Sequence, residues 1–355
     1  MANGNGLPGI SGSASLGWIN YWNLWPLRLE LRKALAGRAE FREGHPSQVN
    51  KWLVEGSIQM APASSICLLK HNQLNFALPV GVASTGPVMS VYLGFPATRR
   101  AAFEVWQERI ADLRATYARV TGLRPFDPRQ IARDLFAATS DSVTPVMAAA
   151  AGMIRLTPAS AASAAMTKTL HKLLFGPDAR GLETRTDVVH GSGDQDAMEL
   201  LIGDEALKRR NEFPHILDLG EVWNRVTGLP FVFAVWQLGA NTDAVEAAAL
   251  RPVMTAVKES AELAQAKMRV AAADYRAALL DSPWGSGAEA VDLTRYWRVI
   301  EYVLTPQHLR GLVLYLCLAR ATGAIRPDND DAALGRLMRW QQQTADASGV
   351  ISSLH

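Results

Sequence analysis

The sequence contains only two cysteines, Cys67 and Cys317, among its 355 residues. Both lie in apolar surroundings, and neither belongs to a CxxC pair. Isolated cysteines of this kind are typical of buried, reduced thiols, and they argue against a disulfide framework or a cysteine-ligated metal. We therefore expect both thiols to serve as small core side chains without a chemical role.

Recognisable metal and nucleotide motifs are also missing. The seven histidines are scattered, and none forms an HExxH motif or another closely spaced pair of ligands. Catalytic metals are usually held by such pairs, so metal catalysis is disfavoured. The sequence has no GxxxxGK[ST] motif and no GxGxxG after a predicted strand, so neither standard nucleotide-binding loop is visible. We expect no metal and no cofactor.

The sequence has no large excess of positive or negative charge, since it contains 36 Lys and Arg residues and 34 Asp and Glu residues. A net charge of +2 gives no electrostatic case for nucleic acid as a partner.

No apolar run reaches the ~18 residues of a membrane-spanning helix. Residues 1–15 are rich in Gly and Ser and lack the basic start and apolar run of a secretory signal. We expect a cytoplasmic monomer or homodimer that binds a small molecule and no membrane.

The chain is long enough for two lobes, each with its own core, and 48% of its residues are hydrophobic. Its first part reads as βαβαβ, with short strands at 16–19, 39–42 and 57–64. The two helices between them are predicted to end at Gly37 and Gly56. This order predicts a parallel sheet with a site at the carboxyl ends of its strands.

Two later β-rich runs, 87–95 and 227–236, are predicted to cross between the lobes. Between them we expect mainly helical sequence at 97–130, a strand at 134–140 and an alanine-rich helix from Thr144. The sequence after the second crossing is predicted to be helical, with one of the helices over 292–304. Two crossings between two α/β lobes describe a hinged clamp, and clamps of this kind close around a ligand.

Several segments resemble one family, the chorismate dehydratases of the futalosine route to menaquinone. They are GWINYWNLWPL, MAPASSICLL, TGPVMSVYL, LLIGDEAL, DLGEVWNRVTGLPFVFAVW and the closing YWRVIEYVLTPQHLRGLVLYLCLARATGAI. The resemblance covers roughly residues 16–325 and is interrupted twice. It is specific, because the first five segments occur in the order that the family has, and the closing segment matches the family's end as well.

The resemblance implies a type II periplasmic-binding-protein-like fold that is used for catalysis without export. This is an α/β clamp of two lobes with two crossing strands and a helical C-terminal part. Two stretches look longer than the family's usual connections, and we interpret them as insertions in lobe 2. The expected ranges are 14–94 and 235–327 for lobe 1, 95–234 for lobe 2, 97–130 and 156–190 for the insertions, and 328–355 for a C-terminal extension.

The resemblance also implies a reaction, the conversion of chorismate to 3-[(1-carboxyvinyl)oxy]benzoate and water. The ring carboxylate is conjugated with the C3 position, so a stepwise elimination through an extended enolate is chemically reasonable. The protein must then stabilise negative charge and position the leaving C4 hydroxyl. No protein base is evident, and the substrate's own enolpyruvyl carboxylate is a candidate base.

Two alternatives remain open. The sister family, 1,4-dihydroxy-6-naphthoate synthase, uses the same fold but typically reads closer to LPLPLG where this chain has LPFVFAVW. That difference favours the dehydratase. The other alternative is a non-catalytic solute-binding protein for small anions, since a fold does not fix a function. The missing export signal weighs against it.

Asn23 and Ser90 fall on positions that resemble the family's active-site Asn and Ser. Asn23 is interpreted as a hydrogen-bond donor to the substrate's carboxylate or leaving hydroxyl, with a helix cap before Pro26 as the alternative. Ser90 is interpreted as holding a carboxylate or relaying a proton, with an ordinary strand serine as the alternative.

The other candidates are neutral hydrogen-bonding groups near predicted helix starts, where helix N-termini favour anions. Some of these residues have helix capping as their alternative role. Asp204 is more readily a cap than a base, because a carboxylate facing a dianion raises its own electrostatic cost. The substrate-binding candidates are Ser64, Ser65, Thr85, Gly86, Thr139, Ser140, Ser142, Gly203 and Asp204.

Overall fold

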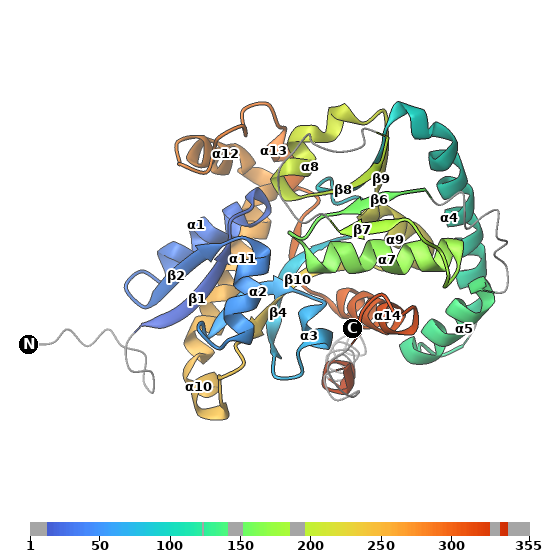
Figure 1. Cartoon of the computed structure of the whole chain (residues 1–355). Helices are drawn as coiled ribbons and strands as arrows, with labels where there is room; N and C mark the ends of the chain where they lie inside the picture. Colours follow the sequence, from blue (N-terminus) through green and yellow to red (C-terminus); the bar gives the residue numbers. More distant parts are fainter. Residues whose placement is uncertain (1–12, 123, 141–151, 185–195, 327–333, 340–355) are drawn as a thin grey trace, which may run out of the picture. The chain divides into compact units, whose positions relative to one another are not determined.

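The computed structural model describes residues 13–122, 124–140, 152–184, 196–326 and 334–339. The chain folds into two compact units, and each unit is assembled from two separate stretches of the sequence. Each unit contains one β-sheet with helices packed on it (Figure 1). The α/β fold class predicted from the sequence is confirmed.

Unit 1 consists of Met1–Ala83 and Val232–Thr305, and unit 2 of Ser84–Phe231 and Pro306–His355. The chain therefore passes between the units three times, whereas the sequence predicts two crossings. The second passage lies within three residues of its predicted position. The assignment differs from the predicted lobes mainly at the residues from 306 onward, which the structure gives to unit 2 and the sequence to lobe 1.

Unit 1 is built on a six-stranded sheet. Its strands are β1 (Ala14–Ile19), β2 (Ala39–Gly44), β3 (Met60–Ser64), β4 (Asn75–Ser84), β10 (Phe231–Leu238) and β11 (Glu301–Val303). They are arranged in the order β11-β4-β10-β3-β1-β2. Strands β2 and β3 run parallel to β1, as predicted, and β10 runs antiparallel to β3. The carboxyl ends of β1, β2 and β3 therefore meet at one edge of the sheet.

The helices of unit 1 pack on the sheet or on one another, and α1 (Trp25–Ala34) packs along the longest of them, α11 (Arg251–Val270) (Figure 1). They are η1 (Trp22–Leu24), α1 (Trp25–Ala34), α2 (Pro46–Val54), α3 (Cys67–Lys70), α10 (Ala244–Ala249), α11 (Arg251–Val270), α12 (Ala272–Leu280) and α13 (Leu293–Trp297). One predicted helix, over 292–304, is wrong in its second half. The segment after α13 forms β11, because it pairs with β4 far away in the sequence.

Unit 2 is built on a five-stranded sheet. Its strands are β5 (Val91–Phe95), β6 (Ile154–Leu156), β7 (Leu182–Thr184), β8 (Met198–Ile202) and β9 (His215–Asp218). They are arranged in the order β7-β6-β8-β5-β9. Strand β5 is antiparallel to both of its neighbours, β8 and β9, so its start lies beside their carboxyl ends. The predicted crossing strand at 87–95 is thus shorter than expected, and residues 85–90 form a loop before it.

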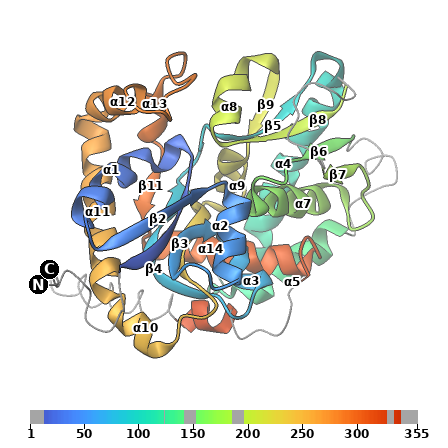
Figure 2. The ribbon, with the colours of Figure 1, turned by 60° about the vertical axis from the view of Figure 1, so that its left-hand side comes forward.

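In unit 2, helix α14 (Pro306–Ala321) packs against α5 (Pro128–Ser140) and α7 (Ala161–Phe175) (Figure 2). The helices that the structure describes in unit 2 are η2 (Ala97–Arg99), α4 (Arg100–Thr121), α5 (Pro128–Ser140), α7 (Ala161–Phe175), α8 (Gly203–Arg209), η3 (Arg210–Glu212), α9 (Leu219–Thr227) and α14 (Pro306–Ala321). Helix α14 is buried on nearly all sides, which explains its membership of unit 2. Among the described residues, no helix is long and apolar enough to cross a membrane.

The predicted strand at 134–140 is wrong, because these residues form the second half of α5. The buried side chains of α5 include Ile131, Ala132 and Leu135, whose spacing fits one face of a helix. The alanine-rich helix predicted from Thr144 begins outside the described residues.

His171 is fully buried in α7, and neither of its ring nitrogens has a hydrogen-bond partner. Its ring lies 6.1 Å from that of Trp106 and 5.5 Å from that of Phe175. Burial, with a smaller contribution from the charge of Lys172, lowers the pKa of His171 to about 4. The imidazole is therefore neutral in the folded protein and gains a proton on unfolding at mildly acidic pH.

We expect this group to make unit 2 acid-sensitive. Its stabilising neutral form is fully effective above its ordinary pKa of 6.5, and the benefit is lost as the pH falls from 6.5 toward 4. Between pH 7 and pH 5 the wild type should lose about 2 kcal/mol of unfolding free energy more than a His171→Leu variant. Urea unfolding of both proteins at the two pH values measures this. Parallel losses in the two proteins would contradict it.

Candidate functional site

In unit 1, the candidate site begins where β1 ends. Asn20 follows the last residue of β1 directly, and its backbone N–H still donates to the carbonyl of Gly44 at the end of β2. Asn23 comes three residues later, within the short helix η1. In both residues the side-chain Oδ1 is buried and has no hydrogen-bond partner.

The backbone around Asn23 is fixed by aromatic side chains rather than by the asparagine itself. The hydroxyl of Tyr302 donates to the carbonyl of Asn23, and the Trp297 Nε1 donates to the carbonyl of Trp22 at 2.8 Å. The Trp22 Nε1 in turn donates to the carbonyl of Trp284 at 2.9 Å. These bonds hold η1 in place and leave the Asn23 amide for another partner.

Asn23 is not a helix cap, which excludes its alternative interpretation. The N-cap residue of α1 is Leu24, the N-cap residue of η1 is Tyr21, and neither makes a side-chain capping bond. Pro26 sits in the first turn of α1, where a missing backbone N–H is tolerated.

Ser64 and Ser65 lie at the carboxyl end of β3, the neighbour of β1. Their backbone N–H groups donate to the Oδ1 of Asn50 at 3.1 Å and to the carbonyl of Phe233 at 3.0 Å. Their hydroxyls are buried without a partner. The helix α3 that follows has Ile66 as its N-cap residue and no side-chain capping bond, so neither serine caps it.

The pairing of β1 with β3 brings the two strand ends together. Leu16 is in register with Met60, and continuing this register by four residues sets Asn20 level with Ser64. Both side chains then project from the same face of the sheet, because side chains alternate along a strand. The Gln237 Nε2 in β10 donates to the carbonyls of Ala63 and Ser64 and ties this edge together.

A buried polar atom without a partner costs about 1–3 kcal/mol, so each such atom calls for an explanation. In the described part of unit 1 these atoms lie at the ends of β1 and β3, in η1 and in β10. They are the oxygens of Asn20, Asn23, Ser64, Ser65 and Gln237 and the Nε1 of Trp236. A ligand with hydrogen-bonding groups, bound at the carboxyl edge of the sheet, would satisfy the groups at the two strand ends.

In unit 2, Ser90 is 2% exposed and immediately precedes β5. The register of β5 places Val91 opposite Ile202 at the end of β8, and Tyr92 opposite Asp218 at the end of β9. The carbonyl of Ser90 accepts a hydrogen bond from the N–H of Gly203 at 2.8 Å. Ser90 thus lies between the carboxyl ends of two strands, where α8 and α9 begin.

Thr85 and Gly86 belong to the loop that leads to Ser90. Thr85 is exposed, while Gly86 is buried and adopts a left-handed conformation with φ of 96°. The Ser84 hydroxyl donates to the carbonyl of Gly86 at 3.1 Å. Gly220 in α9 lets this loop approach closely, since a Cβ at that position would lie 2.7 Å from the Gly86 carbonyl oxygen.

Gly203 and Asp204 form the first turn of α8, beside Ser90. Gly203 is buried with φ of 62°, a conformation that favours glycine. Asp204 is predicted to cap a helix, but the N-cap residue of α8 is Ile202. Asp204 is half-buried one position inside the helix, where a carboxylate interacts favourably with the helix dipole.

The predicted placement of Thr139 and Ser140 at a helix start is wrong. Both lie in the last turn of α5, because the segment that contains them is helical rather than a strand. The Thr139 Oγ1 donates to the carbonyl of Leu135 at 3.0 Å, and the Ser140 Oγ donates to that of Phe136 at 2.7 Å. Ser142 lies outside the described residues.

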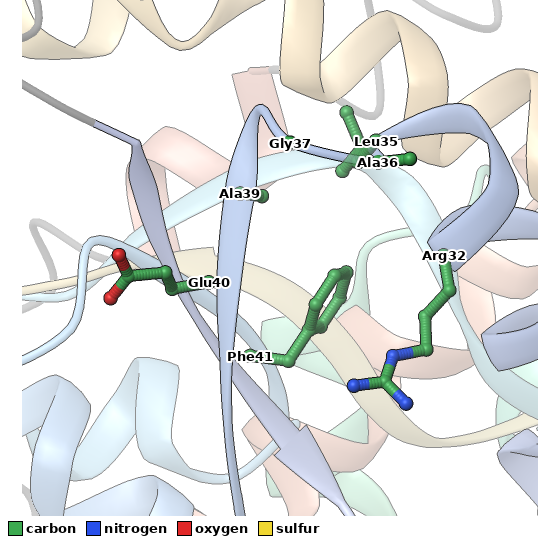
Figure 3. A pocket seen from close by; sticks show the side chains of 7 residues that line it. All are labelled: Arg32, Leu35, Ala36, Gly37, Ala39, Glu40 and Phe41. Atoms are coloured by element: carbon green, nitrogen blue, oxygen red, sulfur yellow. The ribbon is translucent and has the colours of Figure 1, made fainter.

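A surface pocket of about 480 Å³ lies elsewhere in unit 1, between the end of α1 and the start of β2 (Figure 3). The Arg32 guanidinium lies 5.7 Å from the centre of the Phe41 ring, while the Glu40 side chain points away from both. The pocket is at the amino ends of β1 and β2, opposite the edge that carries Asn20. We therefore do not assign the site to it.

Three residues of this site are missed by sequence reasoning, namely Asn20, Gln237 and Asp218. Asn20 could have been found from its position directly after a strand of the predicted parallel sheet. Asp218 begins one of the segments that carry the resemblance, but the sequence does not show its bonds to Val88 and Met89. Nothing in the sequence marks Gln237, whose role depends on contacts with a distant segment. Within the described ranges, no three His, Cys, Asp or Glu residues are grouped closely enough to hold a metal ion.

The fold is shared with solved structures at low sequence identity. The alkanesulfonate-binding protein SsuA of Xanthomonas axonopodis pv. citri matches with a TM-score of 0.57 and 12% identity, over 92% of this chain and 97% of that one. Protein AF1704 of Archaeoglobus fulgidus gives 0.53 and 12%, over 89% and 99%. The CA3427 gene product of Candida albicans, described as having the generic periplasmic binding protein fold, gives 0.52 and 10%, over 92% and 94%.

These likenesses establish a periplasmic-binding-protein-like fold of two domains, as the sequence predicts. No curated protein matches the chain significantly. The family model for menaquinone biosynthesis matches residues 14–114 and 135–321. The gap at 115–134 overlaps the first predicted insertion, and the match continues through the second, at 156–190. Because the match spans most of the chain, the protein belongs to the menaquinone biosynthesis family.

Proposed function

We propose that this protein is a chorismate dehydratase, a hydro-lyase that converts chorismate to 3-[(1-carboxyvinyl)oxy]benzoate and water. Membership of the menaquinone biosynthesis family supports a role in that pathway. The observation that carries the specific reaction is the set of buried, partnerless polar atoms at the ends of β1 and β3. They are neutral groups, suited to a substrate that brings its own charges.

The reaction breaks the C3–H bond and the C4–O bond and leaves the ring itself intact. The C3 proton leaves first, and its electron pair is delocalised through the C1–C2 double bond onto the ring carboxylate. The electrons then return to form the C3–C4 double bond while the C4–O bond breaks. The hydroxyl departs with a proton as water, and the ring becomes aromatic, which makes the elimination favourable.

In this scheme the residues of the protein bind the substrate, stabilise its negative charge and assist the transfer of the proton. The hydroxyls of Ser64 and Ser65 donate to a substrate carboxylate and stabilise negative charge as it develops. The Asn23 Oδ1 accepts from the leaving C4 hydroxyl, and its Nδ2 is the donor available to a carboxylate. Asn20 joins them through its position level with Ser64. Ser90 binds the second carboxylate or relays the proton to the departing hydroxyl.

Proton removal from C3 is assigned to the substrate's own enolpyruvyl carboxylate. The site residues named above include no histidine, lysine or glutamate. The buried carboxylate of Asp218, which holds the loop before Ser90, accepts three backbone N–H bonds and is thereby occupied. An internal base needs no protein group and explains why neutral residues suffice.

The deciding experiment is incubation of the purified protein with chorismate, with the enolpyruvyl-benzoate product followed by chromatography and mass. We expect one product and one water per chorismate, without added metal or cofactor. Tight binding of chorismate without turnover would contradict the enzyme and favour the solute-binding alternative. A protein inert to chorismate that converts a later pathway intermediate to 1,4-dihydroxy-6-naphthoate would favour the sister synthase.

A further inference from the structure

The loop in front of Ser90 is held by a carboxylate from a distant part of the chain. Asp218 ends β9, is 8% exposed, and accepts three backbone hydrogen bonds. Its Oδ1 accepts from the N–H of Val88 and from that of Glu221, each at 3.1 Å. Its Oδ2 accepts from the N–H of Met89 at 2.7 Å. One carboxylate thus caps α9 and fixes the loop.

Met89 has an unusual conformation that this carboxylate supports. Its φ of 63° makes it the one non-glycine residue with positive φ in the described part of the chain. Such a conformation costs an L-residue about 1–2 kcal/mol and persists only where surrounding contacts enforce it. The shortest bond of Asp218 is made to the N–H of Met89. The carboxylate therefore stabilises the strained residue directly before Ser90.

We propose that Asp218 is a positioning residue for Ser90, setting the place of the Ser90 hydroxyl through the left-handed turn at Met89. Two features support an effect of Asp218 on Ser90 through Met89. Ser90 is covalently the next residue, so a change of the Met89 dihedral angles rotates it. Its carbonyl is also tied to the N–H of Gly203 at 2.8 Å, which allows little adjustment on the other side. The inference rests on the proposed function for its catalytic consequence.

Asp218→Asn separates the capping role from the positioning role. With its carbonyl oxygen at the Oδ1 position, asparagine keeps the bonds to Val88 and Glu221. Its NH₂ group then faces the N–H of Met89, so that bond alone is lost. Misplacement of a reacting group by about 1 Å can cost about 10²-fold in rate, and we expect kcat for chorismate to fall by that order.

The control is Asp243→Asn, the same change at another helix cap. Asp243 accepts the N–H groups of Val245 and Glu246 at the start of α10, each at 2.8 Å. It is not linked to any site residue by these bonds. A general effect of the change from Asp to Asn at a cap would appear there too, and we expect kcat to stay at the wild-type value.

A double-mutant cycle with Ser90→Ala tests whether Asp218 acts through Ser90. If it does, Asp218→Asn should cost less than about threefold in kcat once the Ser90 hydroxyl is gone, because coupled residues are not additive. An undiminished loss in the Ser90→Ala background would overturn the proposal. A merely structural role of Asp218 predicts that undiminished loss.

Amide hydrogen exchange gives a second measurement that needs no turnover. In Asp218→Asn, the N–H groups of Met89 and Gly203 should exchange faster, while those of Val88 and Glu221 stay protected. Unchanged protection at Met89 and Gly203 would overturn the positioning role. If the wild type proves inactive on chorismate, the proposed function fails, and exchange still decides whether Asp218 positions Ser90.

If Asp218→Asn alone does not fold, a second pair of variants, both carrying Met89→Gly, tests the proposal. Met89→Gly removes the cost of the left-handed conformation, so the loop can form without Asp218. The backbone N–H at position 89 remains, and without the carboxylate a glycine there is held less firmly. Asp218→Asn combined with Met89→Gly is then compared with Met89→Gly alone by the same exchange measurement. We expect faster Gly203 exchange in the combination. Equal exchange in the two would overturn the proposal.

Discussion

Ser90→Ala should lower kcat/KM for chorismate by about 10²–10³-fold, equivalent to roughly 3–4 kcal/mol of transition-state stabilisation. Ser90 is 2% exposed and lies where the ends of β8 and β9 meet the starts of α8 and α9. Its backbone is held by the bond from the Gly203 N–H to its carbonyl, so the point from which its hydroxyl extends is fixed. A group held in this way needs little reorganisation during the reaction.

The split between kcat and KM distinguishes the two roles proposed for Ser90. A serine that relays a proton acts mainly in the transition state, and its loss lowers kcat with little change in KM. A serine that binds a carboxylate equally in ground and transition states raises KM instead. Steady-state kinetics with chorismate measures both quantities.

The matched control is Ser260→Ala in α11 of unit 1. Ser260 is also a buried serine, 4% exposed, but it lies on a helix that contributes no candidate residue. We expect its kinetic constants to equal those of the wild type. Normal kinetics in Ser90→Ala would remove Ser90 from the site, whatever the control shows.

The first part of the fold is predictable from the sequence because its signals are local. Short strands alternate with helices that end two or three residues before the predicted Gly37 and Gly56, and the parallel arrangement of β1, β2 and β3 follows from that order. The errors occur where the decisive contact is distant. The predicted helix over 292–304 breaks because β11 pairs with β4, more than 200 residues earlier in the chain. The predicted strand at 134–140 fails because the helical period shows only over the longer stretch Pro128–Ser140.

The candidate site is predictable in part for the same reason. Asn23, Ser64 and Ser65 stand at the ends of predicted strands or belong to segments that resemble the family, and the structure finds all three with buried, partnerless oxygens. The sequence cannot show that an oxygen lacks a partner, since that depends on every neighbour in space. Asp218 illustrates the limit, because its function lies in bonds to Val88 and Met89, about 130 residues away.

Asn23→Ala should also lower kcat by about 10²–10³-fold, and it should do so without lowering the melting temperature. The Asn23 Oδ1 is buried and partnerless, and the backbone of η1 is fixed by Tyr302 and Trp297. Removal of the amide therefore breaks none of these bonds and relieves a buried unsatisfied oxygen. A helix cap would behave in the opposite way, with about 1 kcal/mol of stability lost and kcat nearly intact.

Asn224→Ala provides the contrast within the same protein. The Asn224 Nδ2 donates to the carbonyl of Leu229 at 3.2 Å, so this asparagine does serve the fold. Its loss should lower the stability by about 1 kcal/mol and leave kcat unchanged. Melting temperature and kcat measured on both variants therefore place each asparagine in one class. An Asn23→Ala protein with a lowered melting temperature and near-normal kcat would remove Asn23 from the site, because both results would then follow from a structural role alone.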